Sequence, residues 1–252
     1  MALSKNKIKY IQSLKDKKHR LQQGTFVAEG QKLVFDLLSS CRCQLIAALP
    51  EVLAIHPEIK ADEKVECSES DLKKASFLKT PPQIIGVFYQ PALDESAFIA
   101  DDKLSLVLDG IQDPGNMGTI VRTADWFGIE TLYCSPDTVD IYTPKTVQAT
   151  MGAIARVKIR YTDIAELVKN ASQLPVYGTF LEGDNIYDAP LSSKGFIVMG
   201  SEGSGIRPEI EKYITRKLFI PNYPPDKPTS ESLNVAVATA IICSEFRRRL
   251  AR

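Results

Sequence analysis

Short apolar runs alternate with amphipathic segments along the chain, a pattern typical of strands that alternate with helices. In the first third, the apolar runs predict strands at 25–30, 44–50, 64–68 and 84–91. Helical spacing predicts helices at 31–40 and 69–78, and a basic helix from residue 6 that ends at Gly24. These elements predict a small α/β unit.

The rest of the chain repeats this alternation more regularly. Strands are predicted at 104–110, 131–136, 157–162, 175–183, 196–200 and 216–221. Helices are predicted at 113–128, 144–155, 164–173, 206–214 and 232–250. The continuous apolar run at 104–108 is of the kind that parallel sheets bury. The order of elements therefore predicts an α/β fold with a mostly parallel, doubly wound sheet.

A polar, acidic stretch without strong periodicity separates the two parts. We therefore predict an N-terminal domain over 1–92, a linker over 93–102 and a second domain over 103–252. The length of 252 residues agrees with either one large domain or two of modest size.

Charge is unevenly distributed, although the formal net charge of the chain is +0. Within residues 1–25, seven lysines and arginines accompany a single aspartate. The last six residues contain Arg247, Arg248, Arg249 and Arg252. Such clusters attract polyanions, and a solvated helix face is the alternative explanation.

The five cysteines are an odd and scattered set, which argues against a disulfide framework and favours reduced thiols. Both histidines lie in the first quarter, so we expect no metal site and no histidine general base in the second domain. The N-terminus lacks the apolar run of a signal peptide, and the apolar helical stretch at 233–243 is too short to cross a bilayer. The composition therefore predicts a cytoplasmic protein without metal or membrane segment.

Three segments follow predicted strands, where open α/β sheets bind their ligands. The first, DPGNMGTIVRTADWFG, begins a helix near Asn116 and carries Arg122 in its second turn. The unpaired amides of a helix N-terminus and a nearby cation favour an anion, most simply a phosphate. The structural alternative makes Asn116 an ordinary helix cap and pairs Arg122 with Asp125.

The second segment, MGSEGSG, matches neither the dinucleotide fingerprint nor a P-loop, and Glu202 disfavours a phosphate ligand. It fits a ligand without phosphates or an ordinary glycine-rich turn. The third segment, IPNYPPDKPTSESLNVA, leads into a helix. Ser232 suits the cap of that helix, whereas Asn234 is a poor helix former with no evident structural role.

Together the three segments resemble the signature motifs of the SpoU-type (TrmH-like) RNA 2′-O-ribose methyltransferases of the SPOUT superfamily. NMGTIVRTADWFG resembles the first motif, MGSEGSGI the second, and IP followed by SLNVAVA the third. FVAEGQKLV and TPPQIIGVF are similar to the L30e-like substrate-binding domain that often precedes this catalytic domain. The third motif departs from the family pattern, because Asn222 replaces a methionine and YPPDKPT lengthens the loop.

The resemblance implies a fold, a cofactor and partners. The family's sheet carries a C-terminal trefoil knot that binds S-adenosylmethionine (AdoMet), and the family typically forms homodimers with the active site near the subunit interface. By motif match, the catalytic positions are Asn116, Arg122, Glu202, Ser232 and Asn234. The cofactor positions are Gly178, Thr179, Gly200, Ile220 and Leu233.

The implied reaction is methyl transfer from AdoMet to a ribose 2′-hydroxyl of RNA. The family proposal makes the arginine a base, but a guanidinium is effectively always protonated. We therefore expect Arg122 to hold the target phosphate and stabilise the alkoxide, with the basic N-terminal helix following the RNA backbone. By analogy, the front domain favours 23S ribosomal RNA. The alternatives are a tRNA methyltransferase, or a non-catalytic RNA-binding or ribosome-assembly protein on the same fold.

Overall fold

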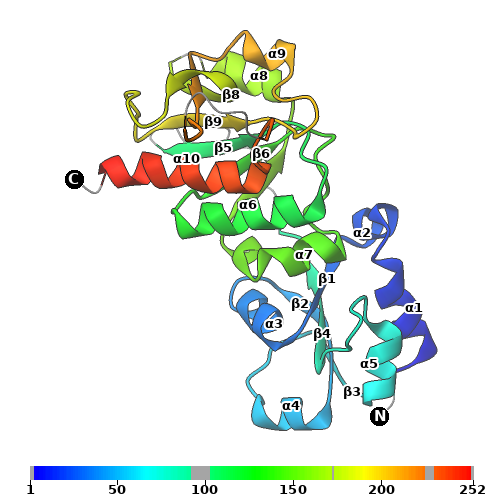
Figure 1. Cartoon of the computed structure of the whole chain (residues 1–252). Helices are drawn as coiled ribbons and strands as arrows, with labels where there is room; N and C mark the ends of the chain where they lie inside the picture. The colour runs from blue at the N-terminus through cyan, green and yellow to red at the C-terminus, as the bar shows by residue number, and fades with distance from the viewer. Residues whose placement is uncertain (1–2, 92–102, 172, 225–229, 251–252) are drawn as a thin grey trace. The chain divides into compact units, whose positions relative to one another are not determined.

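The computed structural model describes residues 3–91, 103–171, 173–224 and 230–250. The chain divides into two compact units, each with its own sheet (Figure 1). The first unit comprises Met1–Ala92 and Asp140–Arg156, and the second comprises Leu93–Val139 and Val157–Arg252. The linker predicted over 93–102 lies outside the described residues.

The first unit contains a four-stranded mixed sheet in the order β1-β4-β2-β3. Its strands are β1 (Thr25–Glu29), β2 (Cys43–Ala48), β3 (Glu63–Glu66) and β4 (Ile84–Tyr89). β4 runs antiparallel to β1 and β2, and β2 runs parallel to β3. Its helices are α1 (Lys5–Ser13), α2 (Lys17–Gln23), α3 (Gln31–Leu38), α4 (Pro50–Ile55), α5 (Glu69–Ala75) and α7 (Pro144–Thr150). The four strands match the predicted ones, whereas α4 was not predicted.

The basic N-terminal segment forms two helices, α1 and α2, and the prediction of a single helix was wrong. Leu14, which is fully buried, lies in the break between them. The side chain of Arg20 is buried and donates from Nη1 to the carbonyls of Leu14 and Lys15 at 2.8 and 2.7 Å. This donor satisfies carbonyl groups that the end of α1 leaves unpaired. Gly24 takes a left-handed conformation (φ 61°) and ends α2 as predicted.

The segment 140–156 lies between β6 and β7 in sequence but contributes α7 to the first unit. Arg20 donates from Nη2 to Asp140 Oδ2 at 2.7 Å, which makes a buried ion pair. The rings of Phe26 and Tyr142 lie 4.8 Å apart, measured between their centroids. These contacts join the segment to α2 and β1.

The helix predicted over 144–155 is interrupted where α7 ends. Met151 (φ 50°) and Gly152 (φ 93°) take left-handed conformations before a short 3-10 helix, η1 (Ala153–Ala155). A Cβ at Gly152 would come 2.1 Å from a carboxylate oxygen of Asp36 in α3, so the contact requires glycine. The apolar periodicity carries no signal of this approach, which explains why it predicted an unbroken helix.

Removing the carboxylate of Asp140 is expected to destabilise the first unit strongly. Asp140→Ala leaves the Arg20 guanidinium buried without its anion, and breaking a buried pair in this way costs about 3–5 kcal/mol. Asp62→Asn is the matched control, because the Asp62–Arg42 pair is exposed and surface pairs contribute little. Urea unfolding followed by circular dichroism measures both variants. Equal stabilities would contradict the role assigned to Asp140.

The second unit contains a six-stranded sheet in the order β10-β8-β9-β5-β6-β7, with parallel pairing throughout. Its strands are β5 (Leu104–Leu108), β6 (Thr131–Cys134), β7 (Lys158–Tyr161), β8 (Val176–Asn185), β9 (Gly195–Met199) and β10 (Arg216–Phe219). Its helices are α6 (Pro114–Trp126), α8 (Ile164–Asn170), α9 (Pro208–Glu211) and α10 (Val235–Leu250). The predicted α/β fold with a mostly parallel sheet is confirmed.

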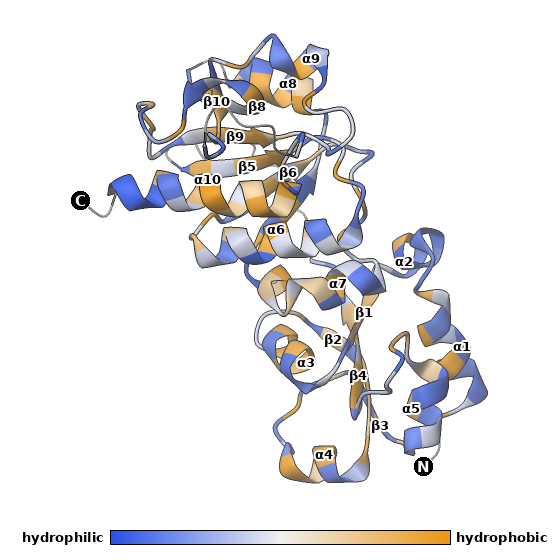
Figure 2. Ribbon diagram, viewed as in Figure 1, coloured by the Kyte–Doolittle hydropathy of each residue, from blue (hydrophilic) through white to orange (hydrophobic). Residues whose placement is uncertain are grey.

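Hydrophobic residues are concentrated in the central strands of this sheet (Figure 2). Both β5 and β9 are buried along their whole length. α6 and α10 pack against each other, and α10 changes from hydrophobic first turns to hydrophilic last turns (Figure 2). Because the strands are parallel, their carboxyl ends share one edge, and the segments that carry the three motifs leave the sheet there.

The arginines near the end of α10 make contacts within the second unit. Arg247 donates to two backbone carbonyls at the end of α6, and Arg249 donates to a carbonyl after β8 at 2.6 Å. Glu245 binds Arg248 and Arg249, and the hydrogen bond from Arg248 is the main reason that the pKa of Glu245 falls to about 2. Arg247, Arg248 and Arg249 therefore have partners within the chain, and the attraction of polyanions by this cluster stays a prediction. Arg252 lies outside the described residues.

Within the described part of the chain, no helix combines the length and hydrophobicity needed to cross a membrane. The same residues contain no group of three or more His, Cys, Asp or Glu side chains that could hold a metal ion. The predicted trefoil knot depends on the path of residues 220–234, of which 225–229 lie outside the described residues, so the knot stays a prediction.

Candidate active site

Side chains from all three motifs meet near the carboxyl edge of the second unit's sheet. Asn116 lies in α6, Glu202 in the loop after β9, and Asn234 directly before α10. Asn234 donates from Nδ2 to Glu202 Oε1 at 2.8 Å and to Asn116 Oδ1 at 2.9 Å. Asn116 Nδ2 donates to the same Glu202 oxygen at 3.2 Å. Three of the five predicted catalytic residues therefore form one hydrogen-bonded cluster.

The orientation of Asn234 is fixed by the helix that it caps. Its Oδ1 accepts from two backbone amides in the first turn of α10, at 3.1 and 3.3 Å. Because Oδ1 faces these donors, Nδ2 is the atom turned toward Glu202 and Asn116. The sequence assigned this cap to Ser232, and that assignment was wrong. Ser232 lies in the preceding loop, exposed and without a hydrogen-bond partner among the described residues.

The start of α6 also differs from the prediction. The N-cap is Asp113, whose carboxylate accepts from the backbone amide of Asn116 at 2.8 Å. Asn116 therefore lies inside the first turn, and its side chain joins the cluster instead of capping the helix. The Asp113 carboxylate accepts a hydrogen bond from an amide that was expected to be free, and it adds negative charge at the start of the helix. This helix start therefore does not provide the predicted phosphate site.

The loop 200–206 presents Glu202 at an exposed position. Ser201 and Gly205 exchange two backbone hydrogen bonds of 3.1 and 2.9 Å, which close the loop. A Cβ at Gly200 would come 2.2 Å from the carbonyl carbon of Gly205, so the closure requires glycine. Glu202 Oε1 accepts three hydrogen bonds, whereas Oε2 has no partner within the described chain. The carboxylate can therefore accept a further hydrogen bond from a ligand.

Arg122 is not part of this cluster in the single chain. It is exposed on α6, and its guanidinium has no hydrogen-bond or ion-pair partner among the residues that the structure describes, Asp125 included. Trp126 lies one turn further along the same helix face and is 85% exposed. Arg122 therefore shares its face of α6 with a large hydrophobic side chain that the chain leaves uncovered.

The predicted cofactor positions come from three neighbouring strands. Gly178 of β8 pairs with Val198 of β9 and with Lys217 of β10. Gly200 directly follows β9, and Ile220 directly follows β10. The sheet register thus brings Gly178, Gly200 and Ile220 to the same edge.

The two other predicted cofactor positions flank this edge. The hydroxyl of Thr179 donates to the carbonyl of Val198 at 3.1 Å, and Leu233 immediately precedes the cap of α10. The pairing of β8 with β10 skips residues 179–183, where Leu181 is 74% exposed. Leu233 is 45% exposed. Leu181 was not predicted as a cofactor position. The overlooked signal is an apolar side chain within a segment rich in glycine and acidic residues.

An ion pair that the sequence pattern did not predict also lies at this edge. Asp109 directly follows β5 and is 1% exposed, and Arg207 directly follows the loop that presents Glu202. The two residues are joined by hydrogen bonds from the backbone amide and the side chain of the arginine. A lone carboxylate directly after a continuous apolar strand was the available signal, because a buried charge requires a partner.

Comparison with known proteins identifies the family of this chain. The model of the SpoU rRNA Methylase family matches residues 103–244, and the model of the MRM3-like substrate binding domain matches residues 5–86. The chain belongs to the SpoU rRNA methylase family. The resemblance drawn from the three motifs is thereby confirmed.

The likeness to SpoU-family proteins extends over both units. The chain is 30% identical over 247 residues to the 23S rRNA (guanosine(2553)-2′-O)-methyltransferase RlmP of Bacillus subtilis, with 96% of each chain covered. A TrmH-family protein of Porphyromonas gingivalis is 42% identical, with a TM-score of 0.90 over 99% of this chain and 100% of its own. An AdoMet-bound rRNA methyltransferase of Sinorhizobium meliloti is 28% identical, with a TM-score of 0.86 over 99% of this chain and 97% of its own.

Proposed function

We propose that this SpoU-family protein transfers a methyl group from AdoMet to a ribose 2′-hydroxyl of 23S ribosomal RNA in the cytoplasm. The cluster of Asn116, Glu202 and Asn234 carries the proposal, because it unites polar side chains from all three motifs. The Bacillus subtilis relative, which matches over nearly the whole chain, is named for 23S rRNA. That name favours ribosomal RNA over transfer RNA as the substrate.

The residues at the carboxyl edge of β8, β9 and β10 fit AdoMet. Leu181 and Leu233 expose apolar side chains that suit an adenine ring, and Glu202 has a carboxylate oxygen available to a cation or a hydroxyl. The bound cofactor supplies a methyl group on a positively charged sulfur. Backbone groups of the motif positions would hold it, namely Gly178, Thr179, Gly200, Ile220 and Leu233.

The hydrogen-bonded cluster orients the ribose that receives the methyl group. Glu202 accepts a hydrogen bond from a ribose hydroxyl, and Asn116 and Asn234 keep that carboxylate in place. Ser232 lies two residues before Asn234 and contacts the same nucleotide. Holding the hydroxyl in line with the methyl group supplies several kcal/mol toward the reaction.

Arg122 holds the phosphate of the target nucleotide and stabilises the alkoxide that develops at the 2′-oxygen. A guanidinium remains protonated at neutral pH, so it donates hydrogen bonds to these oxygens and does not remove the proton. The proton of the 2′-hydroxyl leaves to the phosphate or to water. Arg122 acts through charge that is fixed in place before the reaction, which is an effective form of catalysis.

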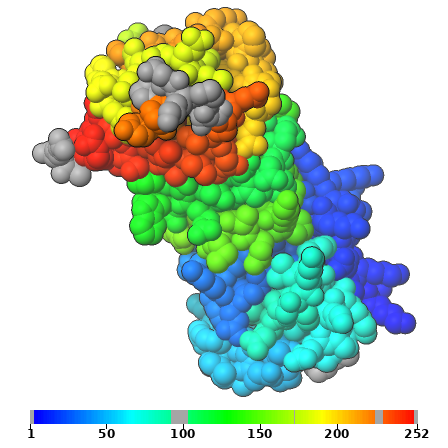
Figure 3. All heavy atoms as spheres, in the orientation of Figure 1, coloured from blue at the N-terminus to red at the C-terminus, as the bar shows by residue number. Residues whose placement is uncertain are grey.

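A second copy of the chain completes the site. Arg122 and Trp126 share one face of α6, and Val237 of α10 is 50% exposed. Figure 3 shows α6 (green) and α10 (red) uncovered on one face of the second unit. Uncovered apolar surface of this kind marks an interaction site. A homodimer formed through this face buries Trp126 and brings Arg122 of one protomer to the cluster of its partner.

The first unit holds the RNA beyond the target nucleotide. The N-terminal segment offers fewer free cations than its composition suggests, because Lys7 pairs with Glu63 and Arg20 pairs with Asp140. The lysines that remain exposed on α1, α2 and the turn between them are Lys5, Lys9, Lys15, Lys17 and Lys18. They supply the charge that an RNA backbone attracts.

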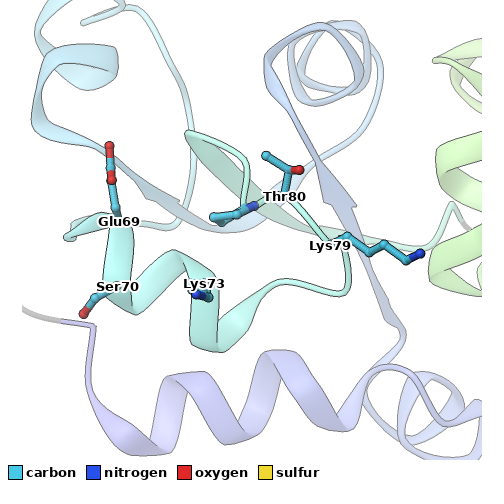
Figure 4. Close-up of a pocket in the computed structure, with 6 residues that line it drawn as sticks. Glu69, Ser70, Lys73, Lys79 and Thr80 are labelled. Carbon is cyan, nitrogen blue, oxygen red and sulfur yellow. The ribbon is translucent and has the colours of Figure 1, made fainter.

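A shallow hollow beside α5 adds to this basic surface (Figure 4). Its volume is about 440 Å³, and it is lined by Glu69, Ser70, Lys73, Lys79, Thr80 and Pro81. Figure 4 shows that Lys79 and Glu69 point in different directions, so these side chains do not converge on one small ligand. The chemistry of the hollow suits a passing phosphate backbone.

Incubation with radiolabelled AdoMet and deproteinised 23S rRNA or tRNA tests the function. Label is expected in 23S rRNA, at a linkage that resists alkali because the 2′-oxygen is methylated. Asn234→Ala is expected to abolish the labelling, and Asn170→Ala, an exposed residue at the end of α8, serves as the control. Labelling of tRNA alone would select the tRNA alternative, and AdoMet binding without transfer would select the non-catalytic one.

A further inference from the structure

Asp109 and Arg207 form an ion pair at the base of the loop that presents Glu202. Asp109 Oδ2 accepts from the backbone amide of Arg207 at 2.8 Å, and its Oδ1 accepts from the arginine Nε at 2.6 Å. The arginine Nη2 lies 2.5 Å from the same Oδ1. Two hydrogen-bond donors of a single residue therefore satisfy one buried carboxylate, and the second guanidinium nitrogen adds a close ionic contact.

Asp109 fixes both ends of the loop 200–206. The backbone amide of Asp109 donates to the carbonyl of Met199, the last residue of β9, at 2.9 Å. Its side chain holds Arg207, the first residue after the loop. Glu202 lies on the exposed part of the loop between these two ends, so its position depends on both attachments.

The geometry of this pair favours arginine over lysine at position 207. Nη2 also faces Asp137, which follows β6, at 3.4 Å, and Nε lies 3.7 Å from Glu209. The guanidinium therefore spans carboxylates that follow two adjacent strands, which a planar group with several donors can do and a single ammonium cannot. The hydrogen bond to Asp109 raises the pKa of Arg207 further, and a guanidinium is protonated at neutral pH even without this shift.

We propose that Asp109 and Arg207 are positioning residues for methyl transfer. They fix the loop 200–206, and through it they place Glu202 against Asn116 and Asn234 and shape the AdoMet-binding edge. No hydrogen bond joins the pair to these three residues in the described chain, so the pair acts through the loop. The inference rests on the function proposed above.

Arg207→Gln removes the charge and the fork of donors while it keeps a polar side chain of related length. We expect the variant to fold, to bind AdoMet about 10–100-fold more weakly and to lose turnover, with the KM for RNA unchanged, because a displacement of about 1 Å is enough to cost 100-fold. Arg207→Lys is expected to restore part of the loss. Arg216→Gln is the matched control, because Arg216 has the same 38% side-chain exposure and makes an ion pair with Asp184.

A double-mutant cycle separates positioning from a general loss of stability. If the pair acts through Glu202, the turnover of Arg207→Gln combined with Glu202→Gln is expected to be no lower than that of the slower single variant. If the fold-losses in turnover of the two single variants multiply in the double variant, the proposal is overturned. A folded Arg207→Gln variant with wild-type AdoMet affinity and turnover would also overturn it. A rise in the KM for RNA alone would also overturn it, because it would make Arg207 an RNA contact.

Hydrogen exchange tests the pair independently of the reaction. The amides of residues 201–206 are expected to exchange faster in Arg207→Gln than in wild type and Arg216→Gln, because one end of the loop is released. Unchanged exchange would overturn the proposal even if methyl transfer is confirmed. Faster exchange together with a wild-type protein that labels no RNA would uphold the fixed loop and reject the proposed function.

Discussion

Arg122→Ala is expected to lower the turnover of RNA methylation by at least about a hundredfold, since it removes the charge that we propose to stabilise the transition state. AdoMet affinity and thermal stability are expected to stay at the wild-type level, because the guanidinium is exposed and has no partner within the described chain. Single-turnover assays with saturating AdoMet measure the chemical step. An Arg122→Lys variant with near-full turnover, and a rate that follows lysine deprotonation, would favour the arginine as a base instead.

Mixing two inactive variants shows which protomer supplies the arginine. Arg122→Ala and Asn234→Ala chains, unfolded and refolded together in equal amounts, form mixed dimers in which one site is intact if Arg122 serves the partner's cluster. About a quarter of all sites are then complete, so about a quarter of wild-type activity is expected to return. No recovery, with mixed dimers confirmed by mass spectrometry, would place Arg122 in the site of its own protomer.

If the proposed homodimer forms through α6 and α10, Trp126→Glu is expected to convert it to a monomer and to abolish methylation without altering the cluster of Asn116, Glu202 and Asn234. A twofold interface repeats every substitution, so the change removes two buried aromatic side chains and places two carboxylates near each other. A tryptophan at the centre of an interface typically contributes about 2 kcal/mol or more to binding. Analytical ultracentrifugation at micromolar concentration measures the change in mass.

The control for this prediction is Ile55→Glu, since Ile55 is another large hydrophobic side chain, 72% exposed, in α4 of the first unit. It is expected to leave both the mass and the activity unchanged. A Trp126→Glu protein that stays dimeric, or a monomeric variant with full activity, would contradict the assignment of the dimer interface to α6 and α10.

The periodic elements of the fold were predictable because burial imposes period 2 on strands and about 3.6 on helices. The errors fall where contacts of single side chains accompany a break in a helix. The break after α1 depends on Arg20 reaching the carbonyls of Leu14 and Lys15. The turn that follows α7 places Gly152 (φ 93°) against the side chain of Asp36. Neither contact leaves a trace in the spacing of apolar residues.

The candidate site was predictable as a set of segments but not as a set of contacts. Parallel strands bring the loops that follow them to one edge, so Asn116, Glu202 and Asn234 could be expected near one another. The caps were misassigned because aspartate, serine and asparagine all suit a helix start, and only the structure selects among them. Asp109 and Arg207 are 98 residues apart in sequence, and no local motif connects them.

The route of residues 140–156 restricts how this protein can be shortened or recombined. The stretch lies in sequence between two strands of the methyltransferase sheet, yet the ion pair of Asp140, the ring contact of Tyr142 and the close approach at Gly152 are made with first-unit residues. A fragment that begins at residue 103 would carry this stretch into water without those partners, including Val147, which is 1% exposed in the whole chain. A chimera that joins a different N-terminal domain to this catalytic sheet would therefore have to replace residues 140–156 together with residues 1–92.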